Sequence, residues 1–118
     1  TTILGLKIYG TAWSNRFFDW AFNAEERELE EIYSKIPECD ILISHGPPFG
    51  LGDVNPQGQH CGSQSLLRAL TRIKPKLVVC GHIHYSYGVY NFLKTKVVNA
   101  STCTEQYRPT NPPIEIEI

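Results

Sequence analysis

The 118-residue sequence contains no methionine and has no excess of charge of either sign. Its 11 Lys and Arg against 12 Asp and Glu give a formal net charge of −1, which argues against binding a nucleic-acid polymer by bulk electrostatics. No run approaches the roughly 18 apolar residues that a membrane helix needs, and the start does not resemble a signal peptide. We therefore expect a cytoplasmic protein with neither a membrane nor a nucleic-acid polymer as partner.

Closely paired cysteines are absent as well. Cys39, Cys61, Cys80 and Cys103 stand about twenty residues apart, with no Cys-x-x-Cys pair. This spacing fits neither a zinc knuckle nor a dense disulfide scaffold. We expect reduced and mostly buried thiols.

The length and the first residues bear on domain organisation. A chain of 118 residues has the size of one domain. Residues 3–9 are apolar and β-branched enough for a strand, which Gly10 would end, and no leader precedes them. Together with the missing methionine, this opening suggests a chain cut out of something longer.

Two helices are predicted from apolar periodicity. Leu29, Ile32, Tyr33 and Ile36 lie on one helical face, in a helix that would start near a capping box of Asn23 and Glu26 and stop at Pro37. A second helix is predicted over about 63–74, with Ser63 as its cap and Pro75 as its stop.

Short apolar runs predict the strands. Residues 40–44 and 76–80 suit strands buried on both faces of a sheet, while 49–62 is a surface loop long enough to suggest a functional role. Strands are also predicted over 87–92, 96–100 and 114–118, the first two as a hairpin through 93–95. The fold class is therefore α/β.

Three of the four histidines follow apolar strands directly. His45, His82 and His84 stand where such a run gives way to a loop, and ligands of open α/β sheets bind at these strand ends. In extended geometry His82 and His84 would share one face, about 6.5 to 7 Å apart. They could chelate one ion together or each serve one ion of a close pair, and the spacing leaves both readings open.

Three further residues are candidates for substrate binding. Gly81 lacks a Cβ and would let a metal-bound substrate approach the backbone. Trp13, like Trp20, could stack on a nucleobase or belong to the core, and the core is the favoured interpretation. His60 is a weaker candidate for touching substrate.

The two histidine motifs resemble those of a known family. The Ser-His-Gly-Pro-Pro run at 44–48 and the Gly-His-Ile-His run at 81–84 resemble the last two signature motifs of the calcineurin-like metallophosphoesterases. Residues 7–10, 13–22, 75–77, 87–88, 99–104 and 109–113 are similar to its metallophosphoesterase-domain-containing branch. The resemblance implies that residues 1–118 are the C-terminal part of one domain, half of a β-sandwich flanked by helices.

The resemblance also implies an activity and a ligand set. Members of the superfamily hold two divalent ions, such as manganese, iron, zinc or nickel, and a metal-bound hydroxide attacks the phosphorus of a phosphoester. His45 and His82 would bind one ion and His84 the other. For this branch the implied substrates are small phosphodiesters of the 3′,5′-cyclic nucleotide type.

Other motifs of the family do not occur in this sequence. The Asp-x-His motif, the bridging Gly-Asp motif and the Gly-Asn-His motif with the catalytic histidine are absent, and Gly52-Asp53 stands at the wrong place in the order. We therefore expect no catalytic residue in this chain, little activity from it alone, and pairing with the N-terminal half of the domain or with a second copy. The alternatives are a non-catalytic binding module and a mononuclear three-histidine metal site.

Overall fold

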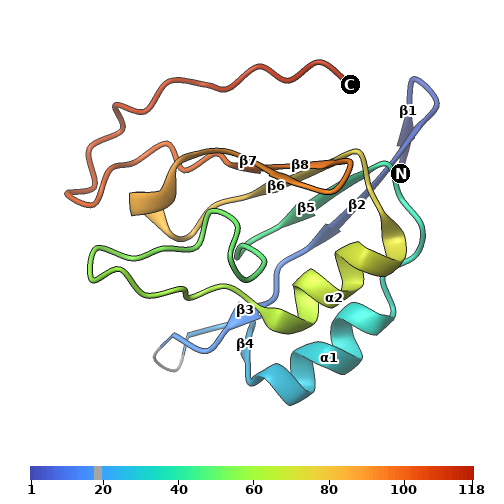
Figure 1. Ribbon diagram of the computed structural model, residues 1–118, viewed down its shortest axis with the longest axis horizontal. Helices are drawn as coiled ribbons and strands as arrows, with labels where there is room; N and C mark the ends of the chain where they lie inside the picture. The colour runs from blue at the N-terminus through green and yellow to red at the C-terminus, as the bar shows by residue number, and fades with distance from the viewer. Residues whose placement is uncertain (18–19) are drawn as a thin grey trace.

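Six strands form one sheet in a computed structural model, which describes residues 1–17 and 20–118 (Figure 1). In spatial order they are β1 (Thr2–Ile3), β2 (Leu6–Thr11), β5 (Ile41–Ser44), β6 (Leu77–Cys80), β8 (Thr95–Asn99) and β7 (Gly88–Phe92). The four central strands are mutually parallel, and β1 and β7 are antiparallel edges. The predicted α/β class is confirmed, and so is the hairpin of β7 and β8.

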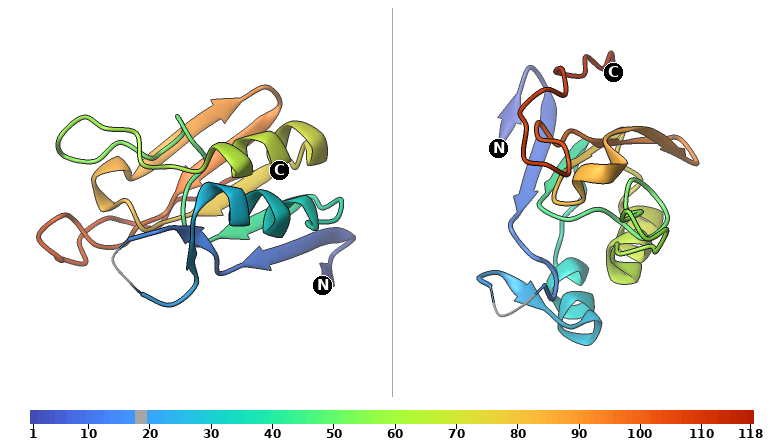
Figure 2. Two further views of the ribbon diagram at one scale, coloured as in Figure 1. Left: turned by 90° about the horizontal axis from the view of Figure 1, so that it is seen from below. Right: turned by 90° about the vertical axis from the view of Figure 1, so that its left-hand side faces the viewer.

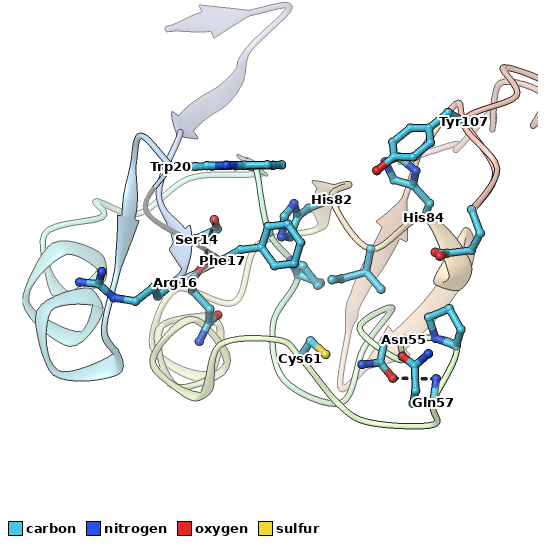
Figure 3. A pocket seen from close by; sticks show the side chains of 16 residues that line it. Ser14, Arg16, Phe17, Trp20, Asn55, Gln57, Cys61, His82, His84 and Tyr107 are labelled. Carbon is cyan, nitrogen blue, oxygen red and sulfur yellow. Dashed lines mark hydrogen bonds between the residues drawn. The ribbon is translucent and has the colours of Figure 1, made fainter.

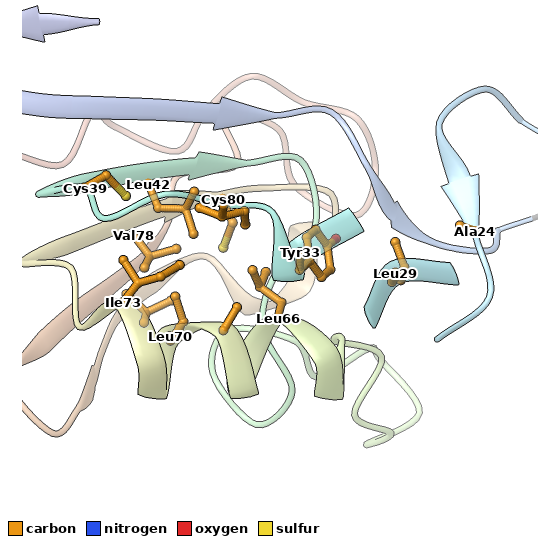
Figure 4. Packing of buried hydrophobic residues seen from close by; sticks show 13 residues of the cluster. Ala24, Leu29, Tyr33, Cys39, Leu42, Leu66, Leu70, Ile73, Val78 and Cys80 are labelled. Carbon is orange, nitrogen blue, oxygen red and sulfur yellow. The ribbon is translucent and has the colours of Figure 1, made fainter. Parts of the chain in front are cut away.

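Both helices, α1 (Glu26–Ser34) and α2 (Gln64–Ile73), lie side by side on one face of this sheet (Figure 2). Their apolar stripes, including Leu29 and Leu66, are fully buried together with Leu42, Val78 and Val97 from the central strands (Figure 4). The other sheet face is partly open, since the side chain of Ile43 is 48% exposed. A single sheet covered by helices on one side agrees with the expected half of a layered fold.

The helix starts differ in part from the prediction. Ser63 caps α2 as expected, because its Oγ accepts from the amide of Leu66. The capping box of α1 is formed by Glu25 and Glu28, so the predicted pair of Asn23 and Glu26 is wrong. A short strand pair, β3 (Ser14–Asn15) with β4 (Asn23–Ala24), precedes the helix and removes Asn23 from it.

Of two further predicted strands, the first is confirmed only in part, since β2 covers residues 6–9 and runs past Gly10, and the second is wrong. The run at 3–9 is broken by a turn at Leu4 and Gly5, whose φ values of 51° and 79° make β1 and β2 a hairpin. The run at 114–118 forms no strand, although Ile114 and Ile116 are partly buried. The alternation of apolar and polar residues over 114–118 therefore goes with partial burial of these two isoleucines, but not with pairing to a neighbouring strand.

The remaining expectations concern thiols and membranes. All four cysteines are free; Cys39 and Cys80 are buried, while Cys61 and Cys103 are half-buried. Within the described residues, neither helix has the length and apolar character needed to cross a bilayer.

Candidate metal and phosphoester site

The adjacent parallel strands β5 and β6 bring two of the predicted histidines together. Ile43 pairs with Val79, so His45 leaves the sheet at the same edge as Gly81 and His82. The amide of Gly81 donates to the carbonyl of His45 over 3.0 Å, which continues the pairing past the strand ends. The Nε2 atom of His45 then lies 3.2 Å from the Nδ1 atom of His82.

A left-handed backbone turn positions His82. Its φ is 67°, a region that residues other than glycine rarely occupy and that costs on the order of 1–3 kcal/mol. The predicted extended geometry of 82–84 is therefore wrong, and His84 begins a 3-10 turn, η1 (His84–Ser86). Strain of this kind is concentrated at functional sites.

The electrostatic environment of His82 favours a neutral imidazole. Burial lowers the pKa of His82, and the nearby His45 and His84 lower it further because a second and third positive charge would repel. A neutral imidazole is the form that binds a metal ion. The environment of His82 thus favours the protonation state a ligand needs.

The third histidine is oriented separately. The Nδ1 atom of His84 lies 3.2 Å from the carbonyl oxygen of Thr104, and only the nitrogen can donate in that bond. In the neutral imidazole, the Nε2 atom is then the one without a proton. A histidine that donates one ring N–H to a backbone carbonyl is the usual arrangement for a metal ligand. The ring also makes an edge contact with Tyr107, at 5.7 Å between centroids.

The donor set fits one ion at two of the histidines. Two nitrogens bound at about 2.0–2.1 Å to a tetrahedral ion stand about 3.3–3.4 Å apart, close to the observed 3.2 Å between His45 and His82. No group of three or more His, Cys, Asp or Glu side chains within residues 1–17 and 20–118 is placed to hold an ion. His84 accordingly does not join the other two, which argues against the mononuclear three-histidine alternative.

His82 and His84 border a cavity of about 480 Å³ (Figure 3). Its described lining comes from four parts of the chain: 14–17 with Trp20, the loop after β5, the turn at 82–84 and the turn that holds Glu105 and Tyr107. The described lining residues are Ser14, Asn15, Arg16, Phe17, Trp20, Gly46, Pro47, Asn55, Pro56, Gln57, Cys61, His82, Ile83, His84, Glu105 and Tyr107. The volume is that of a small-molecule site.

Of the other candidate residues, Trp20 lines this cavity, whereas His45, Gly81, Trp13 and His60 do not. Gly81 is adjacent, but a Cβ there would meet only Ser101 Oγ at 3.5 Å, so the structure gives no steric reason for glycine. Trp13 packs against the core, whereas Trp20 is 62% exposed and contradicts the core interpretation for that residue. His60 is bound through Nδ1 to Asp53 at 2.8 Å.

Sequence reasoning missed several lining residues. Asn55 and Gln57 come from the loop at 49–62, whose length was the one signal of a role. Glu105 and Tyr107 come from a turn that carries no motif. No local pattern could have placed Tyr107 against His84, because they are brought together by the tertiary fold.

Known proteins share this sequence over nearly its whole length. The chain is 46% identical over 121 residues to a protein of Homo sapiens, with 99% of this chain and 37% of the relative aligned, and the mouse counterpart gives the same values. A UPF0046 protein of Caenorhabditis elegans is 37% identical over 119 residues, covering 98% of this chain and 30% of the relative. No protein-family model matches the chain.

A solved crystal structure shares the fold. It has a TM-score of 0.55 at 20% identity, and the alignment covers 80% of this chain and 39% of that chain. At this identity the likeness supports the layered α/β arrangement alone.

These similarities place the chain in the metallophosphoesterase family. The human and mouse relatives are each named metallophosphoesterase domain-containing protein 1. The chain spans about 37% of their length, so it corresponds to a part of such a protein.

Proposed function

We propose that this chain supplies metal-binding histidines to a metal-dependent phosphoesterase centre. The 3.2 Å separation of His45 Nε2 and His82 Nδ1 carries the proposal, because it matches the spacing of two ligands on one ion. His84, oriented by Thr104, is the candidate ligand of a second ion. The name of the mammalian relatives denotes metal-dependent hydrolysis of phosphoesters.

Two ions within a few ångströms of each other repel strongly unless anionic ligands lie between them. The described residues offer no carboxylate beside the His45 and His82 pair, and Glu105 is the acidic residue that lines the cavity. We therefore propose that the bridging carboxylate and the catalytic histidine come from the rest of the domain. When bound, the ions would supply positive charge to polarise the phosphoryl group of the substrate.

The residues of this chain would bind and orient the substrate. His82 and His84 both line the cavity, and the side chains of Asn55 and Gln57 belong to the same lining. The cavity volume of about 480 Å³ suits a small phosphodiester, and 3′,5′-cyclic nucleotides are the proposed substrate class.

The test compares the 118-residue chain with the same chain supplemented by the preceding segment of its domain. We expect negligible hydrolysis of bis(p-nitrophenyl) phosphate with Mn²⁺ by the chain alone and clear turnover after supplementation. In the active sample His82→Ala should reduce turnover at least about 100-fold, consistent with loss of a metal ligand. His60→Gln is the matched control, since His60 lies outside the cavity lining.

Metal content gives a second readout. His82→Ala should lower the Mn²⁺ or Zn²⁺ bound per chain at equilibrium dialysis, whereas His60→Gln should not. Equal turnover by the chain alone and by the supplemented chain would contradict the proposal that the rest of the domain supplies part of the site. A His82→Ala variant with wild-type metal content would contradict the ligand assignment.

A further inference from the structure

Aromatic rings stand on both sides of the histidines at the cavity (Figure 3). Phe17 meets His82 edge-on at 5.4 Å between centroids, and Trp20 meets Phe17 edge-on at 5.1 Å. Tyr107 meets His84 edge-on at 5.7 Å. We call Phe17, Trp20 and Tyr107 the aromatic rim.

The rim does not belong to the hydrophobic core. Phe17 is 44% exposed, Trp20 62% and Tyr107 78%, and none of them is in the buried cluster under the helices. Burying one large apolar side chain is worth about 1.5–3 kcal/mol, so three exposed rings at one cavity forgo substantial stabilisation. Apolar surface gathered in this way is typical of a ligand-binding groove.

The backbone holds Tyr107 at the cavity by an unusual turn. The amide of Thr104 donates to the carbonyl of Arg108, and the amide of Tyr107 donates back to Thr104, each over 2.9 Å. Tyr107 has a φ of 60° in this turn, a left-handed conformation that is unfavourable for a bulky residue. Strained residues of this kind occur at ligand clamps, and here the turn directs the ring onto His84.

Polar side chains line the cavity as well. Ser14, Asn15 and Arg16 precede Phe17, Glu105 lies two residues before Tyr107, and Asn55 and Gln57 come from the loop after β5. The rings that touch the two histidines are Phe17, at His82, and Tyr107, at His84. A phosphoester whose phosphoryl group binds at the histidines therefore has aromatic rings beside it, which fits a substrate with a second, flat part.

We propose that the aromatic rim determines specificity, by selecting phosphoesters that carry a planar aromatic group, an aryl ring or a nucleobase. Trp20 and Tyr107 provide the surfaces for this group, and Phe17 supports Trp20. The proposal rests on the proposed function, because it assigns the phosphoryl group to the histidine side of the same cavity. For Trp20 it favours stacking over the core interpretation, and for Tyr107 it adds a role that the sequence does not indicate.

The test uses two non-hydrolysable probes, phenylphosphonate and methylphosphonate, titrated calorimetrically into the 118-residue chain with Mn²⁺. Stacking a ring on an aromatic side chain strengthens binding about 5- to 100-fold, so phenylphosphonate should bind tighter by a factor in that range. Equal affinities, or no measurable binding of phenylphosphonate, would overturn the proposal.

Variants identify the rings responsible. Trp20→Leu keeps apolar bulk but removes the flat surface, and Tyr107→Asn keeps a residue that tolerates the left-handed turn. Each should reduce the preference for phenylphosphonate at least about threefold and leave methylphosphonate affinity unchanged, while Trp20→Phe should largely restore it. Tyr85→Asn is the matched control, because Tyr85 is 58% exposed and lies outside the cavity lining.

The outcomes separate this proposal from the proposed function. If the phenyl preference survives Trp20→Leu and Tyr107→Asn together, the specificity role is wrong even where metal-dependent turnover is normal. If the preference is present and sensitive to these variants but no phosphoester is hydrolysed by the supplemented chain, the proposed function fails alone. Circular dichroism of each variant confirms that the fold is retained.

Discussion

The side-chain amide of Asn99 donates to the carbonyl oxygen of Ile83 over 2.8 Å and ties the end of β8 to the turn between His82 and His84. The same amide donates to the carbonyl of Gly52 over 2.9 Å. Its oxygen accepts from the amide and the hydroxyl of Ser101. Asn99 is fully buried, so one side chain joins the histidine turn to two neighbouring loops.

Replacing Asn99 by alanine should therefore disturb both stability and metal binding. It leaves the buried carbonyl of Gly52 and the partly buried carbonyl of Ile83 without this partner, and the loss at a buried group costs on the order of 1–3 kcal/mol. We expect a loss of about 2–4 kcal/mol in the free energy of unfolding, measured by urea denaturation. Metal affinity should fall as well, because the backbone that holds His82 in its left-handed turn loses its support.

The control for this variant is Asn91→Ala, at an exposed position on β7. It should change the free energy of unfolding by less than about 0.5 kcal/mol. Similar losses for the two variants would contradict the role assigned to Asn99. A large loss of stability with unchanged metal affinity in folded Asn99→Ala would limit that role to the core.

Glu26 links the two helices through its carboxylate. Although burial raises its pKa, hydrogen bonds from Ser65, Asn15 and Ser63 outweigh that effect and the net pKa is lowered. The carboxylate accepts from the Ser65 amide over 3.0 Å and the Gln64 amide over 3.2 Å, at the N-terminus of α2. A negative charge there is also favoured by the helix dipole.

The sign of the pH dependence follows from the lowered pKa. Stabilisation by Glu26 is fully present above its unfolded-state pKa of about 4.5 and is lost as the pH falls through the lower folded-state value. Glu26→Gln should lower the free energy of unfolding by about 1–2 kcal/mol at pH 7. The difference from wild type should shrink toward zero below about pH 4, as measured by denaturation at a series of pH values.

Exposed Glu38, which lies outside both helices, provides the matched substitution. Glu38→Gln should leave the free energy of unfolding within about 0.5 kcal/mol of wild type at every pH. A Glu26→Gln difference that stays constant from pH 7 to pH 3 would show that packing, and not charge, accounts for it.

The contrast between Glu26 and the strand-end histidines shows what the sequence can reveal. His45 and His82 were predicted together because apolar runs end at both, and neighbouring parallel strands necessarily end at one edge. Glu26 was assigned to the cap of its own helix, yet its partners lie 37 to 39 residues away. Such a contact depends on how two helices pack, which no local pattern encodes.

Backbone conformation was the second feature that could not be predicted from the sequence. The 81–84 run reads as an extended continuation of β6, but the left-handed turn at His82 redirects it and separates His84 from the other histidines. Likewise Tyr107 takes a conformation usual for glycine or asparagine, so its sequence gives no sign of the turn. The histidines could be predicted as ligands, but not their arrangement around the cavity.

Thiol reactivity tests the packing under the helices. Burial, with the charge of Asp53 adding to it, raises the pKa of Cys80 to about 12, and Cys39 is also buried with a raised pKa. Because the thiolate is the reactive form, both should resist iodoacetamide at pH 8 until the chain unfolds. Half-buried Cys103 should be modified in the native state, as read by peptide mass spectrometry.

Cys80→Ala and Cys103→Ala provide the matched pair for this experiment. Some thiols should react only after denaturant is added. Their number should be one lower in Cys80→Ala than in wild type, and unchanged in Cys103→Ala. Rapid native-state modification of Cys80 at pH 8 would contradict the packing of β6 beneath the helices.

A comparison of Gly62 with Gly81 distinguishes a glycine that the fold requires for steric reasons from one that is a candidate for substrate binding. A Cβ at Gly62 would lie 2.4 Å from the carbonyl oxygen of Pro48, and the neighbouring backbone is held by a hydrogen bond of 2.9 Å from the Phe49 amide to the Ser63 carbonyl. Gly62→Ala should therefore cost at least about 2 kcal/mol in the free energy of unfolding. At Gly81 the added Cβ has only an ordinary contact with Ser101, so Gly81→Ala should stay within about 1 kcal/mol of wild type.

The activity of Gly81→Ala in the supplemented chain then becomes informative. If the glycine lets a metal-bound phosphoester approach the backbone, the alanine variant should keep its stability and metal content but lose turnover at least about tenfold, through a higher KM. Normal turnover would remove Gly81 from the substrate-binding residues. Loss of stability equal to that of Gly62→Ala would instead show that Gly81 is required by the fold.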